Sequence, residues 1–251
     1  MLELYKVRKR QGEQAIPDLR KAEIRAPFRG LPVIKAQECG NCRACLEICP
    51  TGAITSAPLN IDLGKCIFCG DCARECPQQA ITFTTGHKIA SNVRAALRIE
   101  AGRTPEYFCL QAMTARPDLA RIFGRSLKLR QVSAAGCNGC EWELNACGNV
   151  NFDMGRFGIE FVASPRHADG ILITGPISEN MAPALEDAYQ CTPEPKIVIL
   201  AGTCAISGGV FQPSPALQRD FLDRHQVDLY LPGCPVHPLT VINGVSDLLG
   251  K

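Results

Sequence analysis

The sequence predicts two folded parts: a small cysteine-rich α+β module, followed by a larger α/β domain with a doubly wound parallel sheet. Two observations predict this organisation. Eight cysteines form two copies of one pattern, and farther along the chain short apolar runs alternate with helical segments. The 251 residues then divide into a basic N-terminal extension (1–35), the cysteine-rich module (36–86), a basic helical linker (87–126) and the α/β domain (127–251).

The cysteine repeat is typical of two-cluster ferredoxins. It reads Cys39-x2-Cys42-x2-Cys45-x3-Cys49-Pro50 and, 27 residues later, Cys66-x2-Cys69-x2-Cys72-x3-Cys76-Pro77. In such a run three cysteines of one copy bind one [4Fe–4S] cluster, and the fourth binds the other cluster. We therefore expect a ferredoxin-like module with one cluster on Cys39, Cys42, Cys45 and Cys76 and one on Cys66, Cys69, Cys72 and Cys49. The alternatives are a disulfide knot or zinc, and structural zinc usually takes two separated ligand pairs.

Five apolar runs predict the strands of the α/β domain, at 127–132, 158–163, 170–174, 196–201 and 227–231. Helical segments at 182–190, 215–225 and 238–249 separate most of them. This alternation favours a parallel sheet with helices on both faces, as in a flavodoxin-like fold. Within the linker, Ile89, Val93 and Leu97 are four residues apart and predict a weak helix, whereas Pro105 and Pro117 interrupt the helical periodicity.

Four further cysteines follow predicted strands. Cys137 and Cys140 follow the first strand, Cys204 follows the run 196–201, and Cys234 follows the run 227–231. Ligands of open α/β sheets bind outside the carboxyl ends of the strands, so we expect these thiols to meet at one sheet edge. Four thiolates suit a third [4Fe–4S] cluster or a tetrahedral zinc. Nearby glycines favour the cluster because they let backbone N–H groups approach its sulfurs: Gly136, Gly139, Gly202, Gly208, Gly209 and Gly233.

Two other interpretations of these residues carry less weight. The four cysteines could be buried structural residues without a metal. The Gly208-Gly209 pair has neither the lysine nor the frame of a phosphate-binding loop, so we reject that function for it.

Charge and hydropathy bound the environment. The first ten residues are charged rather than signal-like, and no run of 18 apolar residues occurs, so we expect a reducing cytoplasm and no membrane span. Residues 1–35 carry a net charge of +5 and 87–130 of +6, against −2 for 36–86 and −7 for 131–251. We expect the basic segments to lie along acidic or lipid-facing surfaces of neighbouring subunits, with solvated tails as the alternative. We expect no nucleic-acid partner, because neither segment interleaves aromatics with its charges as a single-strand binding surface would.

Specific motifs now indicate a family. They are Gly136-Cys-Asn-Gly-Cys-Glu141, Arg156-Phe-Gly-Ile159, Ala163-Ser-Pro-Arg-His-Ala-Asp169, Thr174-Gly-Pro-Ile177, Gly202-x-Cys204-x-x-Ser-Gly-Gly209 and Pro232-Gly-Cys-Pro235. Across about 127–249 the chain resembles the small electron-transfer subunit shared by complex I and membrane-bound, energy-converting [NiFe] hydrogenases. Arg29-Gly30 with Pro32, and Leu63-Gly-Lys-Cys-Ile-Phe-Cys-Gly70, resemble the two-cluster ferredoxin-like subunit of the same complexes. Two normally separate proteins are thus joined in one chain.

The resemblance implies an electron-transfer subunit of an oxidoreductase complex, with three [4Fe–4S] clusters and no catalytic residue of its own. The implied partners are a catalytic large subunit against the Cys137 and Cys234 edge, membrane-arm subunits, and an electron donor or acceptor such as a ferredoxin or a dehydrogenase subunit. The implied location is cytoplasmic, peripheral on the inner face of the cell membrane.

One spacing discriminates within the family. Complex I small subunits have two adjacent cysteines where Cys137-x-x-Cys140 stands, and the C-x-x-C spacing is the hydrogenase type. Electrons are therefore expected to end at a [NiFe] centre. The alternative is a quinone-reducing complex or a nickel-free relative. A free-standing flavin carrier belongs to another class, and the four cysteines leave little room for FMN at the sheet edge.

A few single residues near the third cysteine group have two interpretations each. Glu141 and Glu143 suit a helix N-terminus, with a proton relay or a large-subunit contact as the alternative. Arg166 and His167 are expected at an interface or fixing a loop beside this group, and Trp142 at a subunit interface. The remaining cysteines are expected to be small buried hydrophobic residues: Cys109, Cys147 and Cys191.

Overall fold

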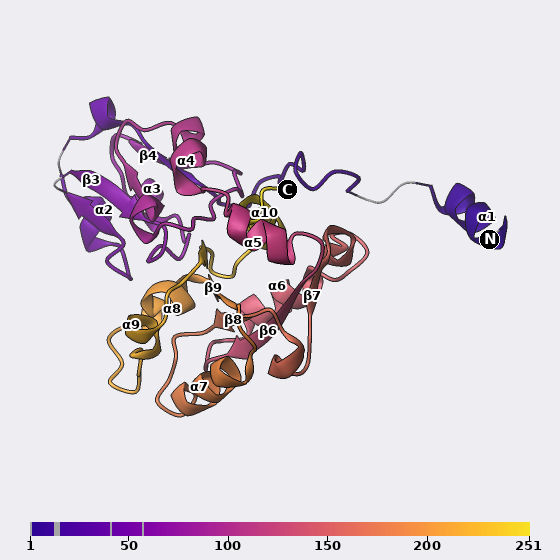
Figure 1. Cartoon of the computed structure of the whole chain (residues 1–251). Helices are drawn as coiled ribbons and strands as arrows, with labels where there is room; N and C mark the ends of the chain where they lie inside the picture. Colours follow the sequence, from indigo (N-terminus) through magenta and orange to yellow (C-terminus); the bar gives the residue numbers. More distant parts are fainter. Residues whose placement is uncertain (1, 13–15, 41, 57) are drawn as a thin grey trace.

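The computed structural model describes residues 2–12, 16–40, 42–56 and 58–251 of the chain. It has a small N-terminal part with two antiparallel sheets and a larger C-terminal part with one parallel sheet (Figure 1). This confirms the predicted fold class, an α+β module followed by a doubly wound α/β domain. No described helix is both long enough and apolar enough to cross a membrane.

The ferredoxin-like part has a two-stranded and a three-stranded sheet. The first pairs β1 (Pro32–Ile34) with β4 (Ile81–Phe83), and the second joins β2 (Ile54–Ser56), β3 (Leu59–Asp62) and β5 (Arg98–Glu100). Its two short helices are α2 (Ala44–Glu47) and α3 (Asp71–Arg74). Strands β1 and β5 lie outside the predicted module 36–86, so flanking segments complete both sheets.

The internal repeat is visible in the backbone. Arg43 and Gly70, 27 residues apart, both have left-handed backbone conformations and immediately precede α2 and α3. The Ala53 N–H lies 3.3 Å from Cys49 Sγ, and the Ala80 N–H lies 3.3 Å from Cys76 Sγ. The repeated Ala-Ile after each cysteine run therefore places an equivalent donor at an equivalent sulfur.

The C-terminal part is built on a five-stranded sheet in the order β10-β9-β8-β6-β7, and every pair is parallel. Counted from its first strand this is the order 2-1-3-4-5 of flavodoxin-like folds. The strands are β6 (Leu127–Ser133), β7 (Ile159–Phe161), β8 (Gly170–Thr174), β9 (Ile197–Ala201) and β10 (Leu229–Leu231). All five predicted runs are confirmed as strands.

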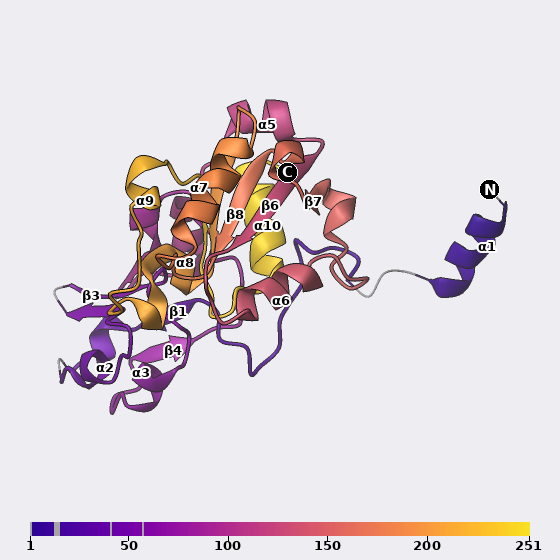
Figure 2. The same cartoon turned by 90° about the horizontal axis from the view of Figure 1, so that it is seen from below.

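Helices cover both faces of this sheet (Figure 2). On one face, Ile171 and Ile173 of β8 share a core with α7 (Ala182–Cys191), α8 (Thr203–Ser207) and α9 (Phe221–Arg224). On the other face, Leu172 shares a core with α5, α6 and α10. Those three helices span Pro117–Phe123, Gly139–Ala146 and Pro238–Leu248. Because β8 is buried on both faces, its five residues are all apolar or small, apart from Thr174.

Two predicted helices differ from the structure. Only 221–224 of the segment 215–225 is helical, because Leu217 pairs with Ser178 and Gln218 donates to the Ile177 carbonyl. In the linker, residues 89–93 form no helix. A 3₁₀ turn at Arg94–Leu97 leads into β5, and α4 (Pro105–Ala112) follows it. The prolines expected to interrupt this region instead begin α4 and α5, where a missing N–H costs nothing.

The basic segments largely pack on their own chain. Leu19 is fully buried in the core that contains α10, and the Leu19 carbonyl accepts a 3.1 Å hydrogen bond from Asn243 Nδ2. Arg20 forms an ion pair with Asp247 of the same helix. Leu97 and Phe123 of the linker are also buried. Both segments thus have buried residues that belong to the fold, and the expectation that their exposed residues lie along neighbouring subunits stays a prediction. Helix α1 (Leu2–Gln11) is different, because it lies apart from the rest in both views (Figures 1 and 2).

Candidate iron–sulfur site

The structure gathers the first cysteine group, Cys39, Cys42, Cys45 and Cys76. All four line one cavity of about 340 Å³, together with Leu46, Leu59 and Ile81. Burial raises the pKa of the Cys45 thiol, and negative charge at Cys39, Cys76 and Cys42 raises it further. Cys42 is exposed, so this cavity reaches the surface of the ferredoxin-like part.

The second cysteine group, Cys66, Cys69, Cys72 and Cys49, lines a narrower and more apolar cavity with Ile54, Ile61 and Phe83. Burial raises the pKa of Cys66 and of Cys72 to about 12, and negative charge at Cys49 and Cys69 contributes to the rise in both. The Phe68 N–H lies 3.3 Å from Cys66 Sγ. In both groups, therefore, the fourth cysteine comes from the other copy of the repeat.

The third cysteine group, Cys137, Cys140, Cys204 and Cys234, lies at the carboxyl edge of the parallel sheet. Cys137 and Cys140 follow β6, Cys204 is in α8 after β9, and Cys234 follows β10. Burial raises the pKa of Cys140 to about 12, with further contributions from Cys204 and Cys234. Burial also raises the pKa of Cys204 to about 11, and charge at Cys234 and Cys137 adds to this.

Two glycines let the backbone approach the sulfurs of the third group. A Cβ atom on Gly202 would lie 2.5 Å from Cys140 Sγ, and one on Gly209 would lie 3.0 Å from Cys204 Sγ. Gly202 has φ +89° and ψ 155°, a conformation essentially restricted to glycine. The backbone N–H of Val236 donates toward Cys140 and lowers the pKa of that buried thiol. These approaches are those expected of glycines beside a group of thiolates.

The cysteine groups can be compared with the three alternatives, a disulfide knot, zinc sites and [4Fe–4S] clusters. The described cysteines are thiols and form no disulfides. Among the described residues, no three His, Cys, Asp or Glu side chains converge on a point where they could hold one metal ion. The repeat spacing of the first two groups fits [4Fe–4S] clusters, and the four cysteines of the third group suit a cluster or a tetrahedral zinc.

The three groups follow one another in space. The pKa of Cys72 in the second group is raised by Cys45 of the first, after burial and the charges at Cys69 and Cys49. The pKa of Cys234 in the third group is raised by Cys69 of the second, after burial and the charge at Cys137. The second group thus lies between the other two.

A hydrogen bond joins the second and third groups directly, and two arginines hold the backbone around the second group. Thr203 Oγ1 donates a 2.8 Å hydrogen bond to the Cys66 carbonyl, and Arg29 Nε donates a 2.6 Å hydrogen bond to the Phe68 carbonyl. Arg94 forms two hydrogen bonds with the buried carboxylate of Asp62, at 2.9 and 2.7 Å. These contacts were not evident in the sequence. Arg94 belongs to no motif, and the motifs that contain Arg29 and Thr203 indicate no partner for their side chains.

The charged residues expected beside the third group separate into two sets. Glu141 Oε1 accepts hydrogen bonds from Ser133 Oγ at 2.6 Å and Thr174 Oγ1 at 2.5 Å, so Glu141 fixes the start of α6 to the ends of β6 and β8. Glu143 lines a cavity of about 230 Å³ with Cys234 and His237, and burial raises the pKa of its carboxyl.

Arg166 and His167 do not lie beside the third group. They are exposed and precede the amino end of β8, whereas the cysteines follow the carboxyl ends of the strands. The predicted placement is wrong because β7 pairs only with the first three residues of β6, and β8 begins opposite the third of them. The loop between β7 and β8 therefore stays at the amino edge of the sheet, away from the cysteines.

The remaining cysteines also differ from one another. Cys147 is fully buried, as predicted, and its Sγ lies 3.3 Å from the Glu143 carbonyl. Cys191 is exposed at the end of α7, so its predicted burial is wrong. The side chain of Cys109 lies outside the described part of the structure.

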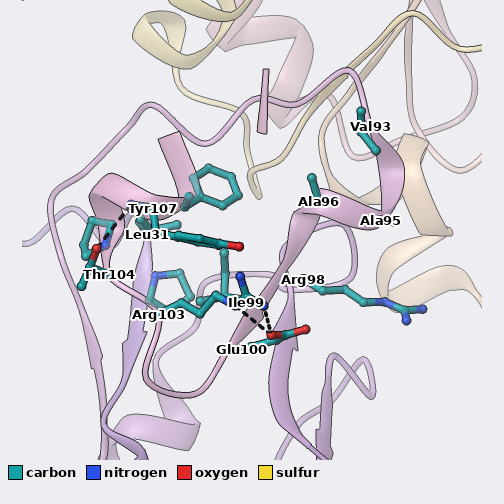
Figure 3. Close-up of a pocket in the computed structure, with 13 residues that line it drawn as sticks. Leu31, Val93, Ala95, Ala96, Arg98, Ile99, Glu100, Arg103, Thr104 and Tyr107 are labelled. Carbon is teal, nitrogen blue, oxygen red and sulfur yellow. Dashed lines mark hydrogen bonds and ion pairs between the residues drawn. The ribbon is translucent and has the colours of Figure 1, made fainter. Parts of the chain in front are cut away.

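A further cavity of about 340 Å³ lies between the three-stranded sheet and α4, away from the cysteines (Figure 3). The Arg103 guanidinium lies 4.3 Å from the centre of the Tyr107 ring, and Arg103 Nε donates to Glu100 Oε2 at 2.8 Å. The residues that line this cavity include no cysteine, so it is separate from the three groups.

The fold and the cysteine groups define an iron–sulfur subunit of the oxidoreductase class. Residues 32–55 and 59–82 match the family of 4Fe-4S binding domains, and residues 137–248 match the family described as NADH ubiquinone oxidoreductase, 20 Kd subunit. The chain belongs to this 20 Kd subunit family, with a ferredoxin-like part joined to its N-terminal side. The resemblance predicted from the motifs is confirmed.

Known relatives come from several complexes. A probable membrane-bound hydrogenase subunit of Pyrococcus furiosus is 41% identical over 134 residues, which are 53% of this chain and 80% of the relative. Formate hydrogenlyase subunit 7 of Escherichia coli is 41% identical over 136 residues, 54% of this chain and 53% of that protein. An NADH-quinone oxidoreductase subunit of Geotalea daltonii is 43% identical over 112 residues, 45% of this chain and 65% of that protein.

Proposed function

We propose that this chain is the electron-transfer subunit of a membrane-associated, energy-converting [NiFe]-hydrogenase-like complex. In this function electrons pass through three [4Fe–4S] clusters to or from a catalytic large subunit. The observation that carries the proposal is the spatial series of three four-cysteine groups, which runs from an open cavity in the ferredoxin-like part to the sheet edge of the α/β domain.

The twelve cysteines fit this cofactor. The first cluster would be held by Cys39, Cys42, Cys45 and Cys76, the second by Cys66, Cys69, Cys72 and Cys49, and the third by Cys137, Cys140, Cys204 and Cys234. Each cluster, when bound, supplies a one-electron carrier whose potential depends on burial and on hydrogen bonds to its sulfurs. The protein supplies these conditions through apolar walls around the second group and backbone donors such as the N–H groups of Ala53, Phe68 and Ala80.

The third group lies on the face proposed to bind the large subunit. Cys137 and Cys234 are exposed in the isolated chain. Large apolar side chains near this group in the sequence are exposed as well: Trp142 at 75%, Val210 at 50% and Phe211 at 37%. Exposed aromatic and aliphatic side chains around a redox group suit a protein interface, which would also exclude water from the cluster.

The rest of the assembly follows from the relatives. The similarity to a membrane-bound hydrogenase subunit supports a membrane-associated complex. Within such a complex we propose membrane-arm subunits as partners and a peripheral position on the cytoplasmic face of the membrane. The open first cavity suits an electron donor or acceptor that is a separate protein, such as a ferredoxin or a dehydrogenase subunit. The chain contributes cluster binding, and the substrate chemistry belongs to the large subunit.

A quinone-reducing or nickel-free complex is the second candidate, and the identity of 43% to an NADH-quinone oxidoreductase subunit favours it. The Cys137-x-x-Cys140 spacing favours the hydrogenase-like complex. The test is to purify the chain with its large subunit and to measure nickel content, hydrogen evolution from reduced methyl viologen, and quinone reduction. Nickel with hydrogen evolution supports the first function. Quinone reduction without nickel would replace it with the second.

A matched pair of variants connects activity to the third group. Cys234→Ser should abolish electron transfer to the large subunit, because it removes a ligand of the terminal cluster. Cys191→Ser changes an exposed cysteine outside the three groups and should leave the rate of electron transfer to the large subunit unchanged. Full activity of Cys234→Ser would contradict the proposed route.

A further inference from the structure

Arg219 occupies an unusual position beside the third cysteine group. Its Nη1 donates to the carbonyls of Pro176 at 2.8 Å and Cys204 at 3.2 Å. Its Nη2 donates to the carbonyls of Ala205 at 2.7 Å and Ile206 at 3.1 Å. One guanidinium therefore joins the loop after β8 to three consecutive residues of α8, the first of which is Cys204.

Backbone hydrogen bonds just before Arg219 determine its position. Ser178 pairs with Leu217, the Glu179 N–H donates to the Ala216 carbonyl at 2.8 Å, and the Gln218 N–H donates to the Ile177 carbonyl at 3.0 Å. The segment before α9 is thus held along the loop that follows β8. This pairing replaces the helix predicted over 215–225 and directs Arg219 toward α8.

Helix α8 needs such a partner. It has only five residues, so most of its backbone carbonyls receive no hydrogen bond from an N–H group within the helix. The Gly208 N–H satisfies the Cys204 carbonyl at 2.8 Å, and Arg219 supplies donors to the same carbonyl and to the next two. Basic side chains near helix C-termini stabilise them in this way. The position of Cys204 consequently depends on a side chain 15 residues farther along the chain.

The charge of Arg219 is not balanced by a carboxylate at ion-pair distance among the described residues. Its hydrogen-bond partners are neutral carbonyls, and the carboxylate of Asp223 acts on Arg219 from beyond ion-pair distance. Because Arg219 Nη1 lies 3.2 Å from the Cys204 carbonyl oxygen and Nη2 binds the next two carbonyls, its positive charge lies close to the third cysteine group. Arg219 would therefore stabilise negative charge there.

We propose that Arg219 is a positioning residue that fixes Cys204 and raises the reduction potential of the cluster bound by the third cysteine group. The proposal rests on the function proposed above, because it requires a cluster at that group. Reduction adds one negative charge to a cluster. A fixed positive charge nearby, partly shielded from water, therefore favours the reduced form.

The test compares three variants of the full chain after anaerobic purification. Arg219→Gln removes the charge, and Arg219→Lys keeps it but loses the forked geometry. Arg224→Gln is the control, because it removes a positive charge from an exposed ion pair with Glu186. Iron content and the midpoint potential of the third cluster are measured by redox titration with electron paramagnetic resonance. The signal of this cluster is identified as the one that Cys234→Ser removes.

We expect Arg219→Gln to shift the midpoint potential of the third cluster to more negative values, Arg219→Lys to shift it less, and Arg224→Gln to leave it unchanged. A wild-type potential in Arg219→Gln with full iron content would overturn the proposal. If Arg219→Gln loses the cluster, Arg219→Lys becomes the deciding variant. A cluster retained in Arg219→Lys with a near-wild-type potential supports the proposal. Loss of the cluster in Arg219→Lys as well would show that Arg219 only holds the loop and has no effect on the potential. A wild-type chain without a third cluster would instead refute the proposed function.

Discussion

Thr203 Oγ1 donates a hydrogen bond of 2.8 Å to the carbonyl of Cys66, 137 residues earlier in the chain. Thr203 is the neighbour of Cys204 in the third cysteine group, and Cys66 belongs to the second group. The contact therefore connects two candidate cluster ligands through one side chain and one peptide. It also holds the ferredoxin-like part on the carboxyl edge of the parallel sheet.

Replacing Thr203 with Val should weaken this junction. The variant keeps the shape of the side chain but leaves the buried Cys66 carbonyl without the hydroxyl donor, at a cost of about 1–3 kcal/mol. We expect a lower temperature of cluster loss and slower electron transfer between the second and third clusters. Thr192→Val is the control, because the buried Thr192 hydroxyl donates to the Ala188 carbonyl of α7, away from the three cysteine groups. Equal behaviour of the two variants would argue against a role for the junction.

Iron and acid-labile sulfide should each be close to twelve per chain after anaerobic purification, as three cubanes require. A value near eight would mean that the third group binds no cluster. One zinc per chain together with eight irons would identify that group as a structural zinc site.

The crossed arrangement of the repeat can be tested by exchanging the fourth cysteines. Cys49→Ser should impair the cluster of Cys66, Cys69 and Cys72, and Cys76→Ser should impair the cluster of Cys39, Cys42 and Cys45. Each variant should lose a different paramagnetic signal, and each serves as the control for the other. The opposite pairing of variants and signals would overturn the ligand assignment.

Gly202→Ala should disrupt the third group in particular. The added Cβ would lie 2.5 Å from Cys140 Sγ, in a backbone conformation that alanine rarely adopts. We expect loss of about one third of the iron and a decrease in stability of about 1–3 kcal/mol. Gly52→Ala is the matched control, because Gly52 also has a positive φ, of +58°, but nothing lies within 4 Å of its added Cβ. Full iron content in Gly202→Ala would show that the cysteines do not need this close approach.

Two N-terminal truncations should have different effects. Removal of residues 1–12 deletes α1, whose exposed side chains include Leu4, Tyr5 and Lys6, and should leave all three clusters in place. Removal of residues 1–30 also deletes Leu19 from the core, where loss of a leucine costs about 2–5 kcal/mol. Thermal unfolding and iron content measure the difference.

Co-purification at low and high salt then tests whether α1 binds neighbouring subunits or lipid. Weaker association of the 1–12 truncation at low salt would support an electrostatic contact, because such contacts are screened over about 8–10 Å. Unchanged association would show that α1 is a solvated extension.

The parallel sheet was predictable because its strands are buried on both faces. Runs such as Gly170–Thr174 and Ile197–Ala201 are almost continuously apolar, and the turns after them carry the cysteines. The sheet edge reached by Cys137, Cys204 and Cys234 follows from strand direction alone. The repeat spacing indicated the members of the first two cysteine groups, and strand direction those of the third; their assignment as cluster ligands stays a prediction.

Features that depend on tertiary contacts were not predictable. Strand β5 forms because Ile99 pairs with Ile61 of β3, and this pairing overrides the weak helical periodicity of the linker. The burial of Leu19 and the orientation of Arg219 depend on neighbours 224 and 15 residues away in the sequence. Local patterns describe the polarity of a segment. They do not identify which distant surface will cover it.

The segments before and after the ferredoxin-like part both pack on the α/β domain, Leu19 on α10 and Ser91 on the edge strand β10. The ferredoxin-like part is therefore attached to the α/β domain at two points, as an inserted domain would be, and cannot diffuse away from the third cysteine group. Where two separate proteins would meet by collision, the effective local concentration here is set by covalent connection. Electron exchange between the second and third groups should then be independent of protein dilution, and every assembled complex should contain the two carriers in equal number.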